Sequence, residues 1–273
     1  MPMTRTRTTS PRRTPGRRRT PPQRTPAGPR CAPRGRSARC AAAPVVCAAL
    51  LTVAALAPPA AAGAAVPLPY RMADTGGGAQ LITAEAPTAD ATRGTVVWWQ
   101  RHNGRWRQAG SAPARFGSGG LTEGTTRVQG TSTTPTGLYD LPFAFGTEAA
   151  PPGTALPYRR VGPDSWWCED NASASYNSWV DPRPADCAAT ESERLADYPV
   201  QYGRALVTGF NYDRPVHGRG AGIFLHVNGK GATAGCVSVP AGAMARILSW
   251  LRPSAHPHLA LGTAYGPTAL TRY

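Results

Sequence analysis

The first 65 residues limit how much of this chain can fold as a domain. They contain 12 Arg and no acidic residue, and an Arg-, Pro- and Thr-rich stretch is followed by an apolar run over 41–57 and small residues over 60–65. This order is that of a secretory signal, and the apolar run is short for a membrane span of roughly 20 residues. We expect cleavage near Ala65. A signal anchor is the alternative, because the basic part is unusually long.

Most of the net charge belongs to this N-terminal segment. The formal charge is +15, but 12 of the 30 Lys and Arg residues lie in 1–65, which leaves 18 against the 15 Asp and Glu residues. A nucleic-acid-binding surface needs Lys and Arg clustered on the folded domain. Lys230 is the single lysine of the sequence. We therefore expect a protein of the cell exterior or cell wall with no nucleic-acid partner, touching a membrane only through an uncleaved signal segment.

The cysteines single out one thiol. Three of the six lie in the signal region, which leaves Cys168, Cys187 and Cys236. In an oxidising compartment two cysteines at moderate separation usually pair, so we expect a Cys168–Cys187 disulfide that restrains its loop by roughly 3 kcal/mol. Cys236 is then a free thiol, either a small buried side chain or a reactive group.

Residues 66–273 are enough for one domain with a hydrophobic core. We divide them into a short linker over 66–79 and a domain over 80–273. Gly, Pro, Thr and Trp are frequent and helical periodicity is rare, which favours a mainly β fold. The Asn103-Gly104 pair supplies the positive φ of a hairpin turn. Strands are expected at 80–85, 96–100, 105–108, 205–210, 222–227 and 258–261, with a loop over 117–126 and a Thr-Pro-Thr-Gly turn over 134–137 that leads into another strand.

Two segments depart from this β pattern. Residues 240–251 predict one C-terminal amphipathic helix, because Pro240 lies in its first turn and apolar residues share one face. Residues 164–197 hold three tryptophans and both disulfide cysteines, which indicates a disulfide-stapled loop insertion. Its aromatic side chains either stack on a ligand or pack over a small core.

The segment 223–240 carries the chemistry. An apolar strand holds His226, a glycine-rich loop follows, and Cys236 comes after Gly235 and ahead of the helix. A nearby imidazole or helix N-terminus increases the thiolate fraction of a cysteine, and backbone amides of the Gly235-Cys236 turn can point at a developing oxyanion. His226 alone is typical of a core histidine. Combined with a free cysteine, it favours catalysis with Cys236 as nucleophile and His226 as base.

This segment resembles the YkuD-type L,D-transpeptidases, in which a His precedes a Ser/Thr-x-Gly-Cys element. His226 matches the histidine, Thr233–Cys236 matches the element, and Thr134–Gly137 resembles the Thr-Pro-x-Gly turn of the family. The resemblance spans roughly residues 80–263. It implies an L,D-transpeptidase-like β-sheet domain that needs no metal or cofactor and acts on peptidoglycan stem peptides in wall biosynthesis.

The resemblance also implies the reaction. Cys236 would attack the carbonyl between diaminopimelate and the terminal D-Ala of a stem tetrapeptide, release D-Ala, and hold the acyl group as a thioester for an amine of a second stem. His226 would accept the thiol proton. Thr233 would supply a hydroxyl to the oxyanion pocket or to loop order. Water as the acceptor would give an L,D-carboxypeptidase.

Several residues near the motif bear on how the substrate would be bound. Ser238 stands where Arg or Asn often follows the family's Cys by two, and the His-to-Cys loop is shorter than in most members. Arg219 and Asn228 are candidates for substrate binding, with ordinary loop charge as the alternative for Arg219. Acceptor choice and oligomeric state stay open.

Other classes fit less well. A sortase-like transpeptidase needs an Arg near its cysteine on a strand, whereas Arg246 lies on the expected helix, and a papain-like hydrolase normally places its Cys before its His. The non-enzymatic alternative is a secreted wall-binding module that uses the Trp-rich loop and keeps Cys236 as an unreactive thiol.

Overall fold

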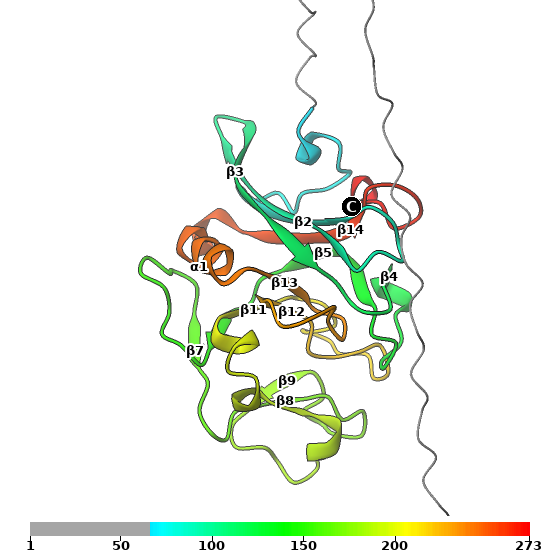
Figure 1. Cartoon of the computed structure of the whole chain (residues 1–273), viewed down its shortest axis with the longest axis vertical. Helices are drawn as coiled ribbons and strands as arrows, with labels where there is room; N and C mark the ends of the chain where they lie inside the picture. The colour runs from blue at the N-terminus through cyan, green and yellow to red at the C-terminus, as the bar shows by residue number, and fades with distance from the viewer. Residues whose placement is uncertain (1–65) are drawn as a thin grey trace, which may run out of the picture. The chain divides into compact units, whose positions relative to one another are not determined.

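The computed structural model describes residues 66–273, so the expected signal segment over 1–65 lies outside the described residues. The described part is mainly β, as predicted. Its strands form one eleven-stranded sheet and one three-stranded sheet (Figure 1). Within residues 66–273 no helix has the length and apolar character needed to cross a membrane.

The large sheet has, in spatial order, the strands β4 (Leu121–Glu123), β5 (Thr134–Asp140), β14 (His258–Thr263), β1 (Gln80–Ala86), β2 (Arg93–His102), β3 (Arg105–Arg115), β13 (Val237–Val239), β12 (Phe224–Val227), β11 (Ala205–Val207), β6 (Ala144–Gly146) and β7 (Tyr158–Arg160). The small sheet has the order β10 (Glu193–Arg194), β8 (Trp166–Cys168) and β9 (Ser178–Val180). The helix is α1 (Ala241–Trp250), and 3₁₀ turns lie at Leu68–Tyr70, Gly124–Thr126, Ala189–Glu191, Leu195–Asp197, Gln201–Gly203, Pro253–Ala255 and Leu270–Arg272.

The hairpin prediction is confirmed, and the strand prediction needs one correction. Asn103 and Gly104 have φ of 49° and 73° and join β2 to β3. The segment Thr134–Gly137 is not a turn: it is the first half of β5 and pairs in parallel with β4, which lies in the predicted loop 117–126. Pairing of two segments is a contact between distant parts of the chain, so local Pro and Gly content could not indicate it.

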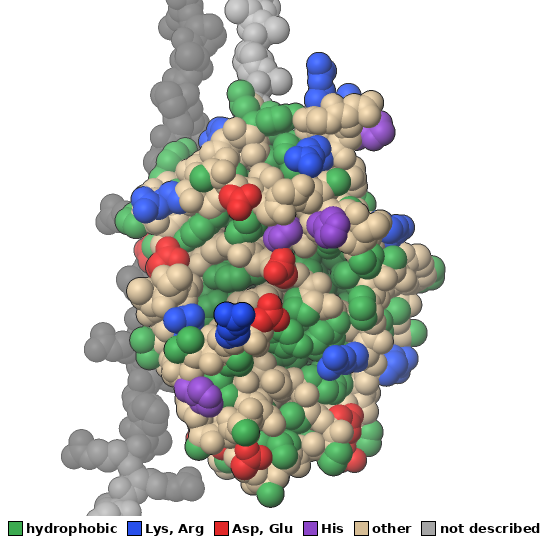
Figure 2. Space-filling model, turned by 180° about the vertical axis from the view of Figure 1, so that it is seen from behind, with side chains coloured by type: hydrophobic (Ala, Val, Ile, Leu, Met, Phe, Trp, Pro, Cys, Tyr) green, Lys and Arg blue, Asp and Glu red, His purple; other side chains and the backbone are tan. Residues whose placement is uncertain are grey.

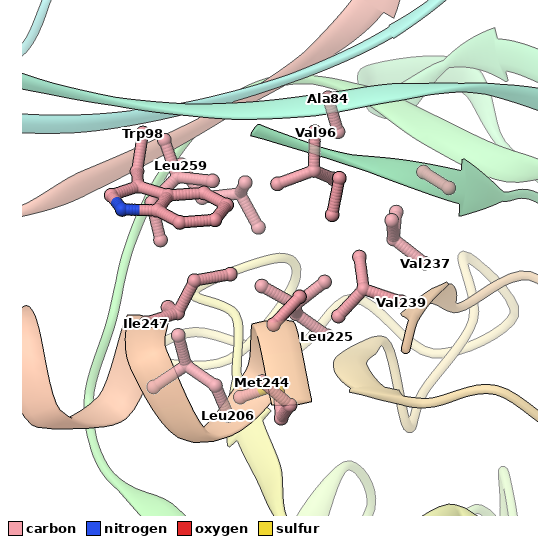
Figure 3. Packing of buried hydrophobic residues seen from close by; sticks show 14 of the residues in the cluster. Ala84, Val96, Trp98, Leu206, Leu225, Val237, Val239, Met244, Ile247 and Leu259 are labelled. Carbon is pink, nitrogen blue, oxygen red and sulfur yellow. The ribbon is translucent and has the colours of Figure 1, made fainter. Parts of the chain in front are cut away.

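Helix α1 packs against one face of the large sheet. Met244 and Ile247 of the helix face Val96 and Trp98 of β2 across a cluster that also contains Leu225 (Figure 3). Burial of each large apolar side chain stabilises the fold by roughly 1.5–3 kcal/mol. Neighbouring residues of a strand point to opposite faces of the sheet. Because Leu225 points into this cluster, the residues before and after it in β12 point to the other face.

On that other side lies an aromatic cluster, which includes the predicted loop insertion. Trp167 and Tyr176 are 1% and 2% exposed and pack with Phe145 and Phe224. Cys236 belongs to the same cluster. The aromatic residues of the insertion therefore serve mainly as core, in the same cluster as the free thiol.

The predicted disulfide between Cys168 and Cys187 is present and closes the insertion. In the chain-entropy account, closing a loop of this size contributes about 3 kcal/mol. We expect reduction, or a Cys168→Ala/Cys187→Ala variant, to lower the melting temperature by about 6–12 °C. Calorimetry with and without reductant measures this shift. The Cys236→Ser variant is the matched control and should show the full effect of reduction, whereas an unchanged melting temperature on reduction contradicts the prediction.

Charged side chains are scattered on the face opposite that of Figure 1. Figure 2 shows Lys and Arg interspersed with Asp and Glu among polar and apolar groups, without one continuous basic area on that face. The absence of a nucleic-acid partner stays a prediction.

Candidate active site

Two parallel neighbouring strands bring the predicted nucleophile and base to one face. β12 and β13 pair so that Leu225 lies beside Val237 and His226 beside Ser238. Leu225 and Val237 both point into the core under α1. Alternation then places His226 and Cys236 on the opposite face, the face of the aromatic cluster.

The loop between these strands is held by the segment that follows β3. The N–H of Thr233 donates to the carbonyl of Phe116 at 2.9 Å, and the N–H of Ser118 donates to the carbonyl of Thr233 at 2.8 Å. This anchoring places the loop end, and with it the cysteine, next to the sheet.

Cys236 is buried, with 8% of its surface exposed. Its Sγ donates to the carbonyl of Gly222 at 3.1 Å and accepts from the N–H of Phe224 at 3.3 Å. Burial, and then the carboxylate of Glu193, raise the thiol pKa well above its ordinary value. The thiol is therefore protonated at rest. The expectation that a helix N-terminus adjoins it is wrong, because β13 separates Cys236 from α1.

His226 is also buried and uncharged. Burial lowers its pKa to about 4, against the opposing effect of the carbonyl of Val227. Nδ1 lies 2.8 Å from that carbonyl oxygen. Since a carbonyl can only accept, Nδ1 carries the hydrogen and Nε2 is the basic nitrogen. The ring of Tyr202 lies edge-on at 5.6 Å and limits how the imidazole can turn.

Thr233 orders the turn that presents the thiol. Its Oγ1 donates to the carbonyl of Cys236 at 2.6 Å and accepts from the N–H of Gly235 at 3.2 Å. Of the two roles expected for Thr233, the geometry supports loop order. Because the N–H of Gly235 is occupied, and no group within 66–273 accepts from the N–H of Cys236, the Cys236 amide is the better oxyanion donor.

Position 235 requires glycine on two grounds. Its φ is +141°, in the region that side chains rarely adopt. A Cβ there would also lie 2.9 Å from Nη2 of Arg127 and 3.0 Å from the carbonyl oxygen of Thr133. The Gly-Cys turn is thus packed directly against the guanidinium of Arg127.

Two cavities meet at the thiol. The first, of about 390 Å³, is lined by Cys236 together with Arg127 and Glu169. The second, of about 250 Å³, is lined by Cys236 together with His226 and Tyr198. Both share Ala234 and Glu193 in addition to the cysteine. The thiol of Cys236 is therefore reachable from two directions, and the histidine from one of them.

The two further substrate-binding candidates lie elsewhere. Arg219 lines a third cavity with Phe210 and Tyr273, and that cavity does not include the thiol. Oδ1 of Asn228 accepts from the hydroxyl of Ser238 at 2.9 Å, so its amide supports the β12–β13 pair and faces neither cavity. The structure does not bring Arg219 or Asn228 to Cys236.

Four charged residues that line the first cavity were not predicted from the sequence: Arg127, Glu169, Glu191 and Glu193. Arg127 lies outside the loop insertion 164–197 that holds the three glutamates, and Glu169 directly follows the run Trp166-Trp167-Cys168. No local spacing marks them, and only the folded chain brings them together.

A mainly β domain with a free cysteine at the junction of two cavities, and a buried histidine on the strand beside the one that follows the cysteine, has the architecture of an L,D-transpeptidase-type acyltransferase. Residues 88–263 match the family model YkuD, described as the L,D-transpeptidase catalytic domain. The chain belongs to this family, which confirms the resemblance drawn from the motifs.

Other comparisons add little. No curated protein matches the chain. A solved structure titled "Structure of Bdellovibrio bacteriovorus Bd1075" is similar at 12% identity and a TM-score of 0.35, and the match covers 67% of this chain and 47% of that one. The present chain thus spans about half the length of that protein, and a likeness of this size carries no argument about function.

Proposed function

We propose that this protein is a peptidoglycan L,D-transpeptidase that joins stem peptides through a Cys236 thioester, with His226 as the base. The position of Cys236 between two cavities is the observation that carries the proposal. A donor and an acceptor can approach one thiol from different sides. An L,D-carboxypeptidase needs room only for water as the acceptor, so a second cavity of about 250 Å³ favours transfer to an amine.

In the first half-reaction, Sγ of Cys236 attacks the carbonyl between diaminopimelate and the terminal D-Ala while Nε2 of His226 takes the thiol proton. The carbonyl oxygen becomes an oxyanion and accepts a hydrogen bond from the N–H of Cys236. As the C–N bond breaks, the histidine returns the proton to the departing amine. D-Ala leaves, and the acyl group stays on sulfur as a thioester.

In the second half-reaction, an amine of a second stem enters the cavity that His226 lines. The neutral imidazole accepts a proton from this amine as its nitrogen attacks the thioester carbonyl. The C–S bond then breaks, the sulfur regains the proton, and the crosslinked product leaves. Because both residues are neutral at rest, proton transfer accompanies each attack and no pre-formed thiolate is involved.

The same proposal covers domain boundaries and location. β1 lies outside the matched residues 88–263 yet pairs with β14 on one side and β2 on the other. Leu270 packs against the outer face of the sheet. These contacts support a catalytic domain over 80–273. We propose that a linker over 66–79, which packs against this domain through Leu68 and Met72, and a signal segment over 1–65 precede it.

Action on the wall requires export, which supports a place outside the cell or in the wall.

Incubation with a diaminopimelate-containing disaccharide tetrapeptide tests the function. We expect loss of D-Ala and a crosslinked dimer in the mass spectrum, and neither product from the Cys236→Ala variant. Loss of D-Ala without a dimer would identify an L,D-carboxypeptidase. No change with either protein would favour the wall-binding module.

A further inference from the structure

Arg127 is a buried cation without a buried counter-ion. Only 6% of its surface is exposed. Nε donates to the carbonyl of Thr133 at 2.8 Å and Nη1 to the carbonyl of Arg219 at 3.1 Å, while the ring of Phe210 lies 5.7 Å from the guanidinium carbon. Within residues 66–273 no carboxylate lies within 4.0 Å of it, because the ion pairs there join other residues.

The third nitrogen of this guanidinium is directed to open space beside the nucleophile. Nη2 of Arg127 donates to no group among the described residues. Among these residues, Nε of Arg204 is the one fully buried side-chain nitrogen without a hydrogen-bond partner, so Nη2 of Arg127 is not fully buried. Nη2 is therefore accessible, and Arg127 lines the first cavity. The ideal Cβ position at Gly235 is 2.9 Å from Nη2, which places this donor next to the Gly235-Cys236 turn.

Three carboxyl groups line the same cavity, of which Glu191 is exposed and Glu169 and Glu193 are half-buried. Oε1 of Glu169 lies against Gly222, whose carbonyl accepts the thiol hydrogen, and no group within 66–273 donates to this carboxyl. Oε2 of Glu193 accepts from the hydroxyl of Tyr202. Burial raises the pKa of the Glu169 and Glu193 carboxyls, and that of Glu169 is raised further by Glu193. A cation held between them would compensate the cost of ionising them.

Arg127 and Glu169 are close enough to influence each other but do not pair. Each shifts the pKa of the other toward its charged form, although their charged atoms are more than 4.0 Å apart. The space between them is part of the cavity of about 390 Å³ that contains Cys236. A ligand with one negative and one positive group matches this arrangement.

We propose that this cavity binds a zwitterionic amino-acid group, with its carboxylate on Nη2 of Arg127 and its ammonium on Glu169 and Glu193. If the proposed function holds, this group is the free side-chain end of the donor's diaminopimelate. That end carries both charges, whereas the terminal D-Ala offers only a carboxylate before cleavage and a lysine side chain offers only an ammonium. Arg127 is then the residue that selects for the carboxylate.

Binding to the full-length Cys236→Ala protein tests this selection without requiring catalysis. Calorimetry would compare three stem tetrapeptides that carry diaminopimelate, diaminopimelate amidated on its side-chain carboxyl, or lysine. We expect the dissociation constant to rise roughly 10- to 100-fold on amidation, and similarly for lysine, because each ligand loses a charge-assisted hydrogen bond to the guanidinium. Equal binding of all three peptides overturns the proposal, whatever the activity of the enzyme.

A second variant in the same background assigns the effect to one residue. Arg127→Gln is expected to weaken diaminopimelate binding to the level of the amidated peptide, so that the ratio of the two constants approaches one. Arg219→Gln, an arginine in the third cavity, is the matched control and should retain the ratio. Retained discrimination in a folded Arg127→Gln protein would also overturn the proposal. If that variant does not fold, the comparison of ligands decides alone.

Discussion

Replacing Cys236 by serine is expected to lower the rate of D-Ala release by roughly 10⁴-fold or more. The buried site raises the pKa of the thiol and leaves it neutral. A serine hydroxyl has a much higher intrinsic pKa and is a weaker nucleophile than a thiol, so the same imidazole in a site built around sulfur activates it far less. Single-turnover release of D-Ala, followed by mass analysis, measures the difference.

A covalent probe provides the control for this result. A carbapenem should add its mass to the native protein and not to the Cys236→Ser variant, while the melting temperatures of both proteins stay within a few degrees. An adduct on the variant would place the nucleophile elsewhere. A native protein that stays unmodified would point to an inert thiol and a binding function.

Replacing His226 by glutamine is expected to lower kcat/KM by about 10²- to 10⁴-fold at neutral pH, the usual contribution of a general base. Because burial lowers the pKa of His226 to about 4, the imidazole is neutral and competent over a wide range. The acid limb of kcat/KM in the native protein should therefore fall near pH 4 rather than near 6.5. A pH profile with the limb near 6.5 would contradict a buried neutral base.

The same residue makes stability depend on pH. The unfolded chain binds a proton at this histidine below pH 6.5, whereas the folded chain does so only near pH 4. Acidification from pH 6.5 to pH 4 therefore favours the unfolded state, by about 3 kcal/mol from this group. Urea unfolding at pH 7 and pH 4 should show this loss in the native protein, and a smaller loss in His226→Gln. Equal losses would assign the acid sensitivity to other groups.

The proposed catalytic pair could be picked out from the sequence because both residues lie in one segment. His226 and Cys236 are separated by a short glycine-rich loop, and the odd number of cysteines in 66–273 already left Cys236 unpaired. The Cys168–Cys187 disulfide, the hairpin turn at Asn103-Gly104 and helix α1 followed from equally local signals. In each case the residues involved are near one another in the sequence, or, for the disulfide, the small number of cysteines leaves few possible pairs.

The surroundings of the thiol were not predictable in this way. β13 stands between Cys236 and α1, which removes the helix N-terminus from the thiol and leaves burial to determine its protonation. Arg219, chosen for its charge and its place before the histidine strand, faces another cavity. Arg127 and Glu169, which carry no local signature, line the cavity beside the thiol of Cys236.

The sequence by itself indicated the proposed catalytic pair and the class of fold, because strand alternation, turn chemistry and cysteine count act over short stretches of chain. The tertiary structure alone decided the charge state of the thiol and the imidazole, and which charged side chains surround them. These properties depend on burial and on contacts among residues 127, 169, 193 and 226–236, which are distant in the sequence. A local pattern contains no information on either, since solvent exclusion and charge proximity arise only when those segments pack.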